Sequence, residues 1–195
     1  SWNNANHIAM VGVRAKEVFF EDIPPSNLVF LIDVSGSMNQ PDKLPLLKKS
    51  FAHLVQNLRP QDRVSVVVYA SVTGVVLECT SGSAKEQIMN SINRLEPGGS
   101  TAGGAGIQHA YSLATKNFIE GGNNRVILAT DGDFNVGASS EEALVRLIRE
   151  KRDRGIYLSV LGFGTGNYQD AKMEQLADKG DGNYAYIDCL SEGQR

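Results

Sequence analysis

Four short runs of almost uninterrupted aliphatic residues constrain the fold of this chain more than any other feature. The runs are LVFLI at 28–32, VSVVVYA at 64–70, VILAT at 126–130 and YLSVLGF at 157–163. A strand that is covered on one face alternates apolar and polar residues, whereas a strand buried on both faces reads as a continuous apolar run. The four runs therefore predict interior strands of a sheet that is covered on both sides.

Segments with a helical repeat of apolar residues lie between and beside these runs. Such stripes occur at 44–58, 88–95, 107–118 and 144–148. Alternating strands and helices favour an α/β fold, in which right-handed crossovers build a mostly parallel sheet between two layers of helices. VVLEC at 75–79 is an exception. It follows the second run after a four-residue connection, so we expect an antiparallel hairpin there.

With 195 residues, the chain fits one domain and an additional terminal segment. Residues 1–26 lack the strand–helix alternation, and we interpret them as an appended segment, either an extra strand or the end of a preceding domain. Residues 27–195 form the α/β domain, with YAYID at 184–188 as a weaker sixth strand. The sequence stops after LSEGQR, where another helix is about to begin. We therefore expect a fragment of a longer protein whose last helix is truncated.

Composition excludes several kinds of partner. The formal net charge is −3 and there is no basic cluster, so nothing favours nucleic acid or anionic lipid. No apolar run approaches the ~20 residues that span a bilayer, so this fragment does not insert into a membrane. The cysteines Cys79 and Cys189 are too few for a disulfide framework and lack metal-ligand spacing. We expect a monomer in isolation.

Hydroxyl and carboxylate side chains gather in three loops near the ends of the predicted interior strands. The loops contain DVSGSM at 33–38, GGST at 98–101 and TDGD at 130–133, and the candidate ligands are Asp33, Ser35, Ser37, Thr101 and Asp131. In a doubly wound sheet, ligands bind beyond the carboxyl ends of the strands, where the strand order reverses. We expect the three loops to meet there.

All donor atoms of this set are oxygens. The absence of Cys and His disfavours zinc, copper and iron. Mg²⁺, at ~2.0–2.1 Å from its ligands and with waters retained, fits better than a carboxylate-rich calcium cage, although Mn²⁺ or Ca²⁺ could substitute. Hydroxyls are neutral. If they bind the ion directly and the two aspartates act through water, the ion stays electron-poor, and its open position favours an Asp or Glu carboxylate from another protein.

These motifs resemble the metal-ion-dependent adhesion site of the von Willebrand factor type A family, whose members are also called integrin I-like domains. The resemblance covers residues 27–190, and all five ligand positions match. It implies a Rossmann-like, doubly wound sheet of six strands in the order 3-2-1-4-5-6, with strand 3 antiparallel at one edge. Cys79 and Cys189 would then lie at opposite edges, beyond the ~7 Å limit between bridged Cα atoms, and both thiols would be free. The resemblance also implies a state in which Asp131 replaces Thr101 as ligand while the last helix shifts.

A narrower likeness concerns the segments NLVFLIDVSGSM, KLPLLK, TDGDFNVG and GNYAYID. They are similar to a group of bacterial envelope-associated proteins of largely unassigned role, in which such a domain is one part of a longer chain. This likeness implies a location in the cell envelope, on its periplasmic or extracytoplasmic side.

We therefore interpret the chain as a non-enzymatic, magnesium-dependent protein-binding module for adhesion or scaffolding. One alternative is a metal-dependent hydrolase or phosphotransfer enzyme, which needs a nucleophile or base beside the metal. His7, His53 and His109 are scattered and only Asp133 is near, so this alternative has little support. Another alternative is a structural domain of an envelope assembly.

The sequence leaves the roles of four single residues open. Thr101 could cap the helix that begins near Gly103 as well as bind the metal, and Asp133 could order its loop rather than bind. Met38 and Phe134 could contact a partner at the rim of the site if they are exposed. Otherwise, Phe134 tucks under its own loop.

Overall fold

The computed structural model describes residues 22–98, 103–132, 134, 141–164 and 170–193. Within this part, the strands form one sheet in the order β3-β2-β1-β4-β5-β6. They are β1 (Ser26–Asp33), β2 (Arg63–Tyr69), β3 (Thr73–Ser81), β4 (Asn123–Thr130), β5 (Ile156–Phe163) and β6 (Tyr184–Ile187). Neighbouring strands are parallel except β2 and β3, which are antiparallel. The predicted fold class, strand order and antiparallel edge strand are confirmed.

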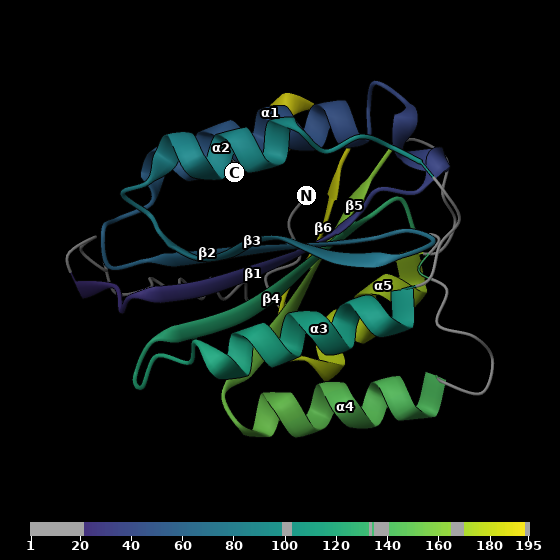
Figure 1. Cartoon of the computed structure of the whole chain (residues 1–195). Helices are drawn as coiled ribbons and strands as arrows, with labels where there is room; N and C mark the ends of the chain where they lie inside the picture. Colours follow the sequence, from purple (N-terminus) through teal and green to yellow (C-terminus); the bar gives the residue numbers. More distant parts are fainter. Residues whose placement is uncertain (1–21, 99–102, 133, 135–140, 165–169, 194–195) are drawn as a thin grey trace, which may run out of the picture.

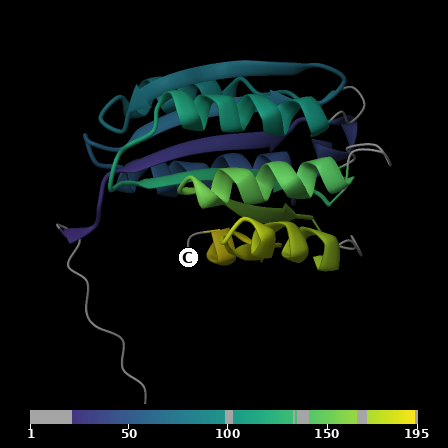
Figure 2. The same cartoon turned by 90° about the horizontal axis from the view of Figure 1, so that it is seen from below.

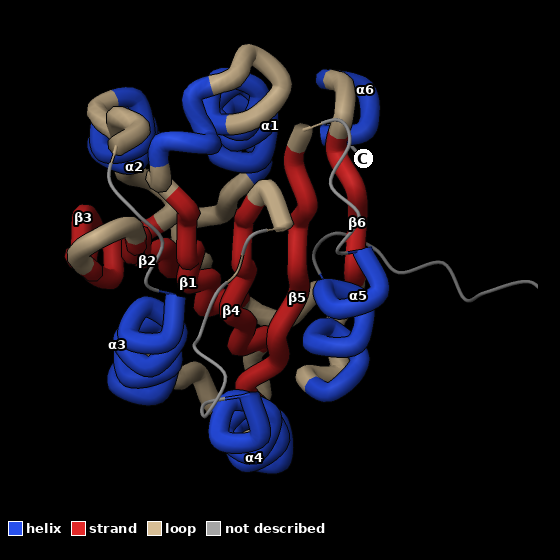
Figure 3. The backbone as a smooth tube through the Cα atoms, turned by 90° about the vertical axis from the view of Figure 1, so that its right-hand side faces the viewer, coloured by secondary structure: helices blue, strands red, loops and turns tan. Residues whose placement is uncertain are grey.

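Helices cover both faces of this sheet (Figure 1). Helices α1 and α2 lie over one face together with the short α6, and α3, α4 and α5 lie over the other (Figures 2 and 3). Their bounds are α1 (Leu44–Asn57), α2 (Lys85–Asn93), α3 (Gly103–Lys116), α4 (Glu141–Asp153), α5 (Asp170–Lys179) and α6 (Leu190–Gly193). A 3-10 helix, η2 (Gly36–Asn39), precedes α1. The stripes at 44–58, 88–95, 107–118 and 144–148 fall in or beside α1, α2, α3 and α4.

Strand β1 contributes to two hydrophobic cores. Leu28, Phe30 and Ile32 pack in the core beneath α1 and α2, whereas Val29 and Leu31 pack in the core beneath α3. Because successive side chains of a strand point to opposite faces, a strand covered on both faces is apolar at every position. Burial of each such side chain stabilises the fold by about 1.5–3 kcal/mol.

An ion pair between Arg59 and Asp62 fixes the entry of the chain into β1. The Arg59 guanidinium lies 2.9 Å from the Asp62 carboxylate and also donates to the carbonyl oxygens of Ile23 and Pro24. The amide of Ser26, the first residue of β1, donates to Asp62 Oδ1 at 2.9 Å. We call Arg59 and Asp62 the entry clasp. It holds the segment before β1 against the loop before β2.

Both cysteines are free, as predicted, with Cys79 on the edge strand β3 and Cys189 just after β6 at the opposite edge, and both are exposed. Of the expected appended segment 1–26, residues 1–21 lie outside the described residues. None of the helices in the described part combines the length and the apolarity needed to cross a membrane.

Candidate metal site

The sheet brings the first and third predicted loops to one end. β1 lies between β2 and β4, and Ile32 near its end is in register with Ala129 near the end of β4. The connection after β1 leads to α1 on one face, and the helix before β4, α3, lies on the other (Figure 3). This is the reversal of strand order at which α/β sheets bind ligands. Asp33 ends β1, and Asp131 directly follows β4.

The first loop folds so that its two serine hydroxyls converge. The Ser35 amide donates to Asp33 Oδ1 at 2.8 Å, and this bond turns the chain into η2. Ser35 Oγ and Ser37 Oγ then lie 3.0 Å apart and are joined by a hydrogen bond. Ser35 is buried and Ser37 is exposed. The pair therefore spans from the protein interior to its surface.

This spacing fits one octahedral ion. Adjacent ligands of an octahedron with bonds of about 2.1 Å are about 3.0 Å apart, the separation of the two hydroxyl oxygens. Among the described residues, no group of three or more His, Cys, Asp or Glu side chains is placed to hold a metal. The candidate donors of this part are two hydroxyls and two carboxylates, which suits a hard cation such as Mg²⁺.

Asp33 is fully buried and supports the loop from below. Its Oδ2 accepts hydrogen bonds from the Tyr69 hydroxyl at 3.1 Å and from Thr130 Oγ1 at 3.4 Å. Burial raises the pKa of Asp33, and the bonds from Ser35 and Tyr69 oppose this increase. Burial and the neighbouring Asp33 raise the pKa of Tyr69 well above its usual value, so the phenol stays protonated and donates. Asp33 thus uses both carboxylate oxygens to hold its surroundings.

Asp131 is also buried, with 3% of its side chain exposed, and is paired with a lysine. Lys43 Nζ lies 2.9 Å from Asp131 Oδ2 and donates to the Ser37 carbonyl oxygen at 3.1 Å. The lysine thereby joins the first and third loops. Sequence reasoning missed Lys43. The only available signal was a basic residue at the start of the helix that follows the first loop.

The second loop is described only at its flanks. Thr101 and Asp133 lie outside the described residues, so their expected roles stay predictions. The Gly98 amide donates to the carbonyl oxygen of Val34 in the first loop at 2.7 Å. A Cβ on Gly106 of α3 would lie 3.0 Å from Tyr69 Cβ. Gly98 is therefore attached to the first loop, and α3 packs closely against Tyr69.

The apolar residues expected at the rim are buried instead. Met38 is 0% exposed and Phe134 is 1% exposed. Phe134 packs edge-on against the Tyr69 ring, with the ring centroids 5.6 Å apart. The hypothesis that these two residues contact a partner is wrong, and Phe134 packs against Tyr69 instead. Asn39 and Gln40 are exposed beside Ser37, which makes this part of the rim polar.

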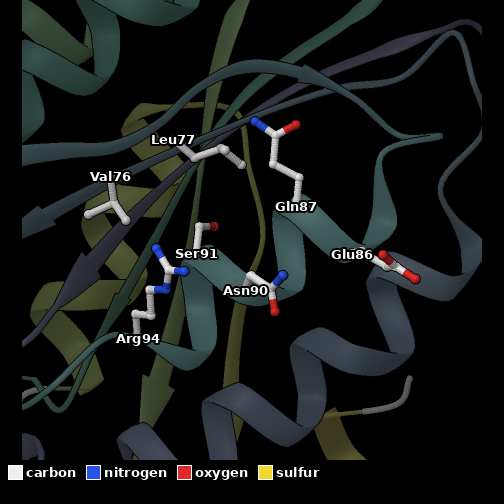
Figure 4. A pocket seen from close by; sticks show the side chains of 7 residues that line it. All are labelled: Val76, Leu77, Glu86, Gln87, Asn90, Ser91 and Arg94. Atoms are coloured by element: carbon white, nitrogen blue, oxygen red, sulfur yellow. The ribbon is translucent and has the colours of Figure 1, made fainter.

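A hollow of about 510 Å³ lies elsewhere, between β3 and α2 (Figure 4). Leu77, Gln87 and Arg94 are among its lining residues, and it shares none with the metal loops. Its lining mixes apolar, amide and charged groups without a histidine or cysteine. We find no chemical arrangement in it that suggests catalysis.

The sequence matches the von Willebrand factor type A domain family over residues 27–192. Among curated relatives, the uncharacterized protein YfbK of Escherichia coli is 47% identical over 194 residues, covering 100% of this chain and 34% of the relative. Human inter-alpha-trypsin inhibitor heavy chain H4 is 28% identical over 162 residues, covering 78% of this chain and 17% of the relative. The chain thus spans only part of the length of these relatives.

Solved structures share the fold. A von Willebrand factor type A protein from Catenulispora acidiphila superposes with a TM-score of 0.74 at 20% identity, covering 88% of this chain and 40% of that one. The conserved hypothetical protein BatB from Bacteroides thetaiotaomicron gives 0.67 at 23% identity, covering 86% and 93%. Domains of this family are commonly metal-dependent adhesion or protein-interaction modules, and most are not enzymes. Since the family match extends over most of the chain and the fold agrees, this chain belongs to the von Willebrand factor type A family.

Proposed function

We propose that this domain is a Mg²⁺-dependent protein-binding module that captures a carboxylate of a partner protein. Ser35, Ser37 and Thr101 would bind the ion directly, and Asp33 and Asp131 would hold waters or orient the hydroxyls. A partner Asp or Glu would complete the octahedron. The observation that carries the proposal is the 3.0 Å separation of two serine hydroxyls above a buried, hydrogen-bonded Asp33.

The arrangement of the two aspartates supports binding rather than catalysis. A general base must have a lone pair that can reach the proton it removes. Both oxygens of Asp33 accept hydrogen bonds inside the protein, and Asp131 is paired with Lys43. Both side chains are also buried, so they are better placed to hold the loops than to reach a substrate. Neutral hydroxyl ligands leave the positive charge of the ion largely unbalanced, so the ion itself would bind an anionic oxygen.

We extend the proposal to location and to the second state of the site. The likeness to bacterial envelope-associated proteins supports an envelope location, and one solved neighbour is an aerotolerance-related membrane protein from Bacteroides fragilis. The exchange of Thr101 for Asp131 as ligand, coupled to movement of the last helix, is part of the same proposal. α6 contacts α1, the helix that follows the metal loop, which gives such a coupling a physical route.

Calorimetry and pull-down experiments test the proposal together. We expect the domain to bind Mg²⁺ in a calorimetric titration and to retain partner protein from a native extract in Mg²⁺ but not in chelator. The double variant Ser35→Ala/Ser37→Ala should lose both properties while keeping its circular dichroism spectrum. Capture that persists in chelator would refute a metal-mediated contact. Turnover of generic phosphoesters that Asp33→Ala abolishes would instead favour a metal-dependent enzyme.

A further inference from the structure

Lys43 is held in a defined position at the metal site. Its side chain is only 13% exposed, and Nζ is bonded to one group from each of two loops, the Ser37 carbonyl and the Asp131 carboxylate. The residue stands at the N-cap of α1 but makes no side-chain capping bond. The side chain therefore stabilises the two loops and does not cap its own helix.

The lysine stem lies in a slot that a glycine leaves open. Gly164 follows β5 with φ +93°, and a Cβ there would lie 2.6 Å from Lys43 Cε. The Tyr186 hydroxyl donates to the Gly164 carbonyl oxygen, which attaches this glycine to β6. Elements far apart in the sequence thus fix the lysine where it is. A mostly buried lysine needs a charged partner, and Asp131 is that partner.

The charge balance of the loops depends on this lysine. Without it, two ionised aspartates would balance the two positive charges of a magnesium ion. With the Lys43 ammonium paired to Asp131, the ion, the lysine and the two aspartates together carry one excess positive charge. Because the serine ligands are neutral, they do not offset that charge.

We propose that Lys43 is the specificity-determining residue of the site. It neutralises Asp131, so part of the positive charge of the bound ion stays uncompensated and attracts the carboxylate of the partner. This inference rests on the proposed metal-dependent function. It has two opposite consequences. The lysine repels the metal and lowers the affinity of the domain for it, and it raises the affinity of the loaded site for an anion.

The test uses Mn²⁺ as the metal and acetate as the carboxylate probe. Mn²⁺ affinity is measured by calorimetry on wild type and Lys43→Met, and acetate binding to the Mn²⁺-loaded proteins is followed by the decrease in water-proton relaxation. We expect Lys43→Met to bind Mn²⁺ roughly tenfold more tightly and acetate about threefold or more weakly. A purely structural role would weaken both equilibria. The opposite signs therefore identify an electrostatic role.

Lys49→Met is the matched control, because Lys49 is an exposed residue of the same helix and its replacement changes the net charge equally. It should change each constant by less than about twofold. Lys43→Gln serves as a second variant if Lys43→Met unfolds. Weaker Mn²⁺ binding, or unchanged acetate binding, in a folded Lys43 variant would overturn the inference. Failure of the wild type to bind Mn²⁺ would instead defeat the proposed function.

Discussion

Single residues show where spacing in the sequence is informative. The pattern Asp33, Ser35, Ser37 was recognisable because one loop carries it, and the structure brings its hydroxyls together. Tyr69 and Lys43 were not recognisable, since each reaches the site from another element: Tyr69 from the end of β2 and Lys43 from the start of α1. The burial of Phe134 depends on Tyr69 in the same way. Contacts between residues that are far apart in the sequence leave no recognisable local pattern in it.

Tyr69→Phe tests the support beneath Asp33. Removal of the hydroxyl takes one donor from a buried carboxylate, so the free energy of unfolding should fall by about 1–3 kcal/mol, and Mg²⁺ should bind several-fold more weakly. Denaturant unfolding and calorimetry measure the two effects. Tyr157→Phe is the control, because the Tyr157 ring contacts Arg125 and its hydroxyl makes no hydrogen bond to a described residue. Equal stability of the two variants would show that Asp33 does not depend on Tyr69.

At the scale of helices and strands, the apolar patterns predicted most of the architecture. Each predicted strand is present, and its observed bounds extend or shift by one to three residues. α5 was not predicted, because its buried residues Met173, Leu176 and Ala177 form a short stripe among charged residues. The sheet order was not deducible from periodicity and came from the family resemblance. Periodicity determines which face a residue occupies, not which strands are neighbours.

The entry clasp makes a prediction about pH. Burial raises the pKa of Asp62, but bonds from the Arg59 side chain and the amides of Arg59 and Ser26 outweigh it and hold this pKa below its usual value. A lowered carboxylate pKa adds stability above the unfolded pKa of about 4, and this stability is lost as the pH falls through the folded pKa. Asp62→Asn should therefore cost about 1–3 kcal/mol at pH 7 and less near about pH 3, with the remainder lost only below the folded pKa.

Urea unfolding at both pH values measures this difference. Asp153→Asn provides the comparison, since Asp153 pairs with Arg152 while 65% of its side chain is exposed. Its effect should be much smaller at either pH. A loss in Asp62→Asn that is equal at both pH values would contradict a role for the ionised carboxylate.

For the whole molecule, the proposed site links metal binding to folding. Its candidate ligands come from segments that only the folded sheet brings together, so the ion should bind the native state alone. At a Mg²⁺ concentration of about 100 times Kd, the expected stabilisation is about 2.7 kcal/mol, or roughly 5–10 °C in Tm for a domain of this size. Thermal unfolding with and without chelator measures it. A Tm that is independent of Mg²⁺ in the wild type, or equally dependent in Ser35→Ala/Ser37→Ala, would contradict this linkage.

The most direct test is a crystal structure of the domain soaked in Mn²⁺, with the ion located by its anomalous scattering. We predict one peak within about 2.5 Å of both Ser35 Oγ and Ser37 Oγ, with a coordination position open to solvent or filled by an acidic side chain of a neighbouring molecule. The absence of a peak at saturating Mn²⁺, or a peak that the two hydroxyls do not share, would contradict the account.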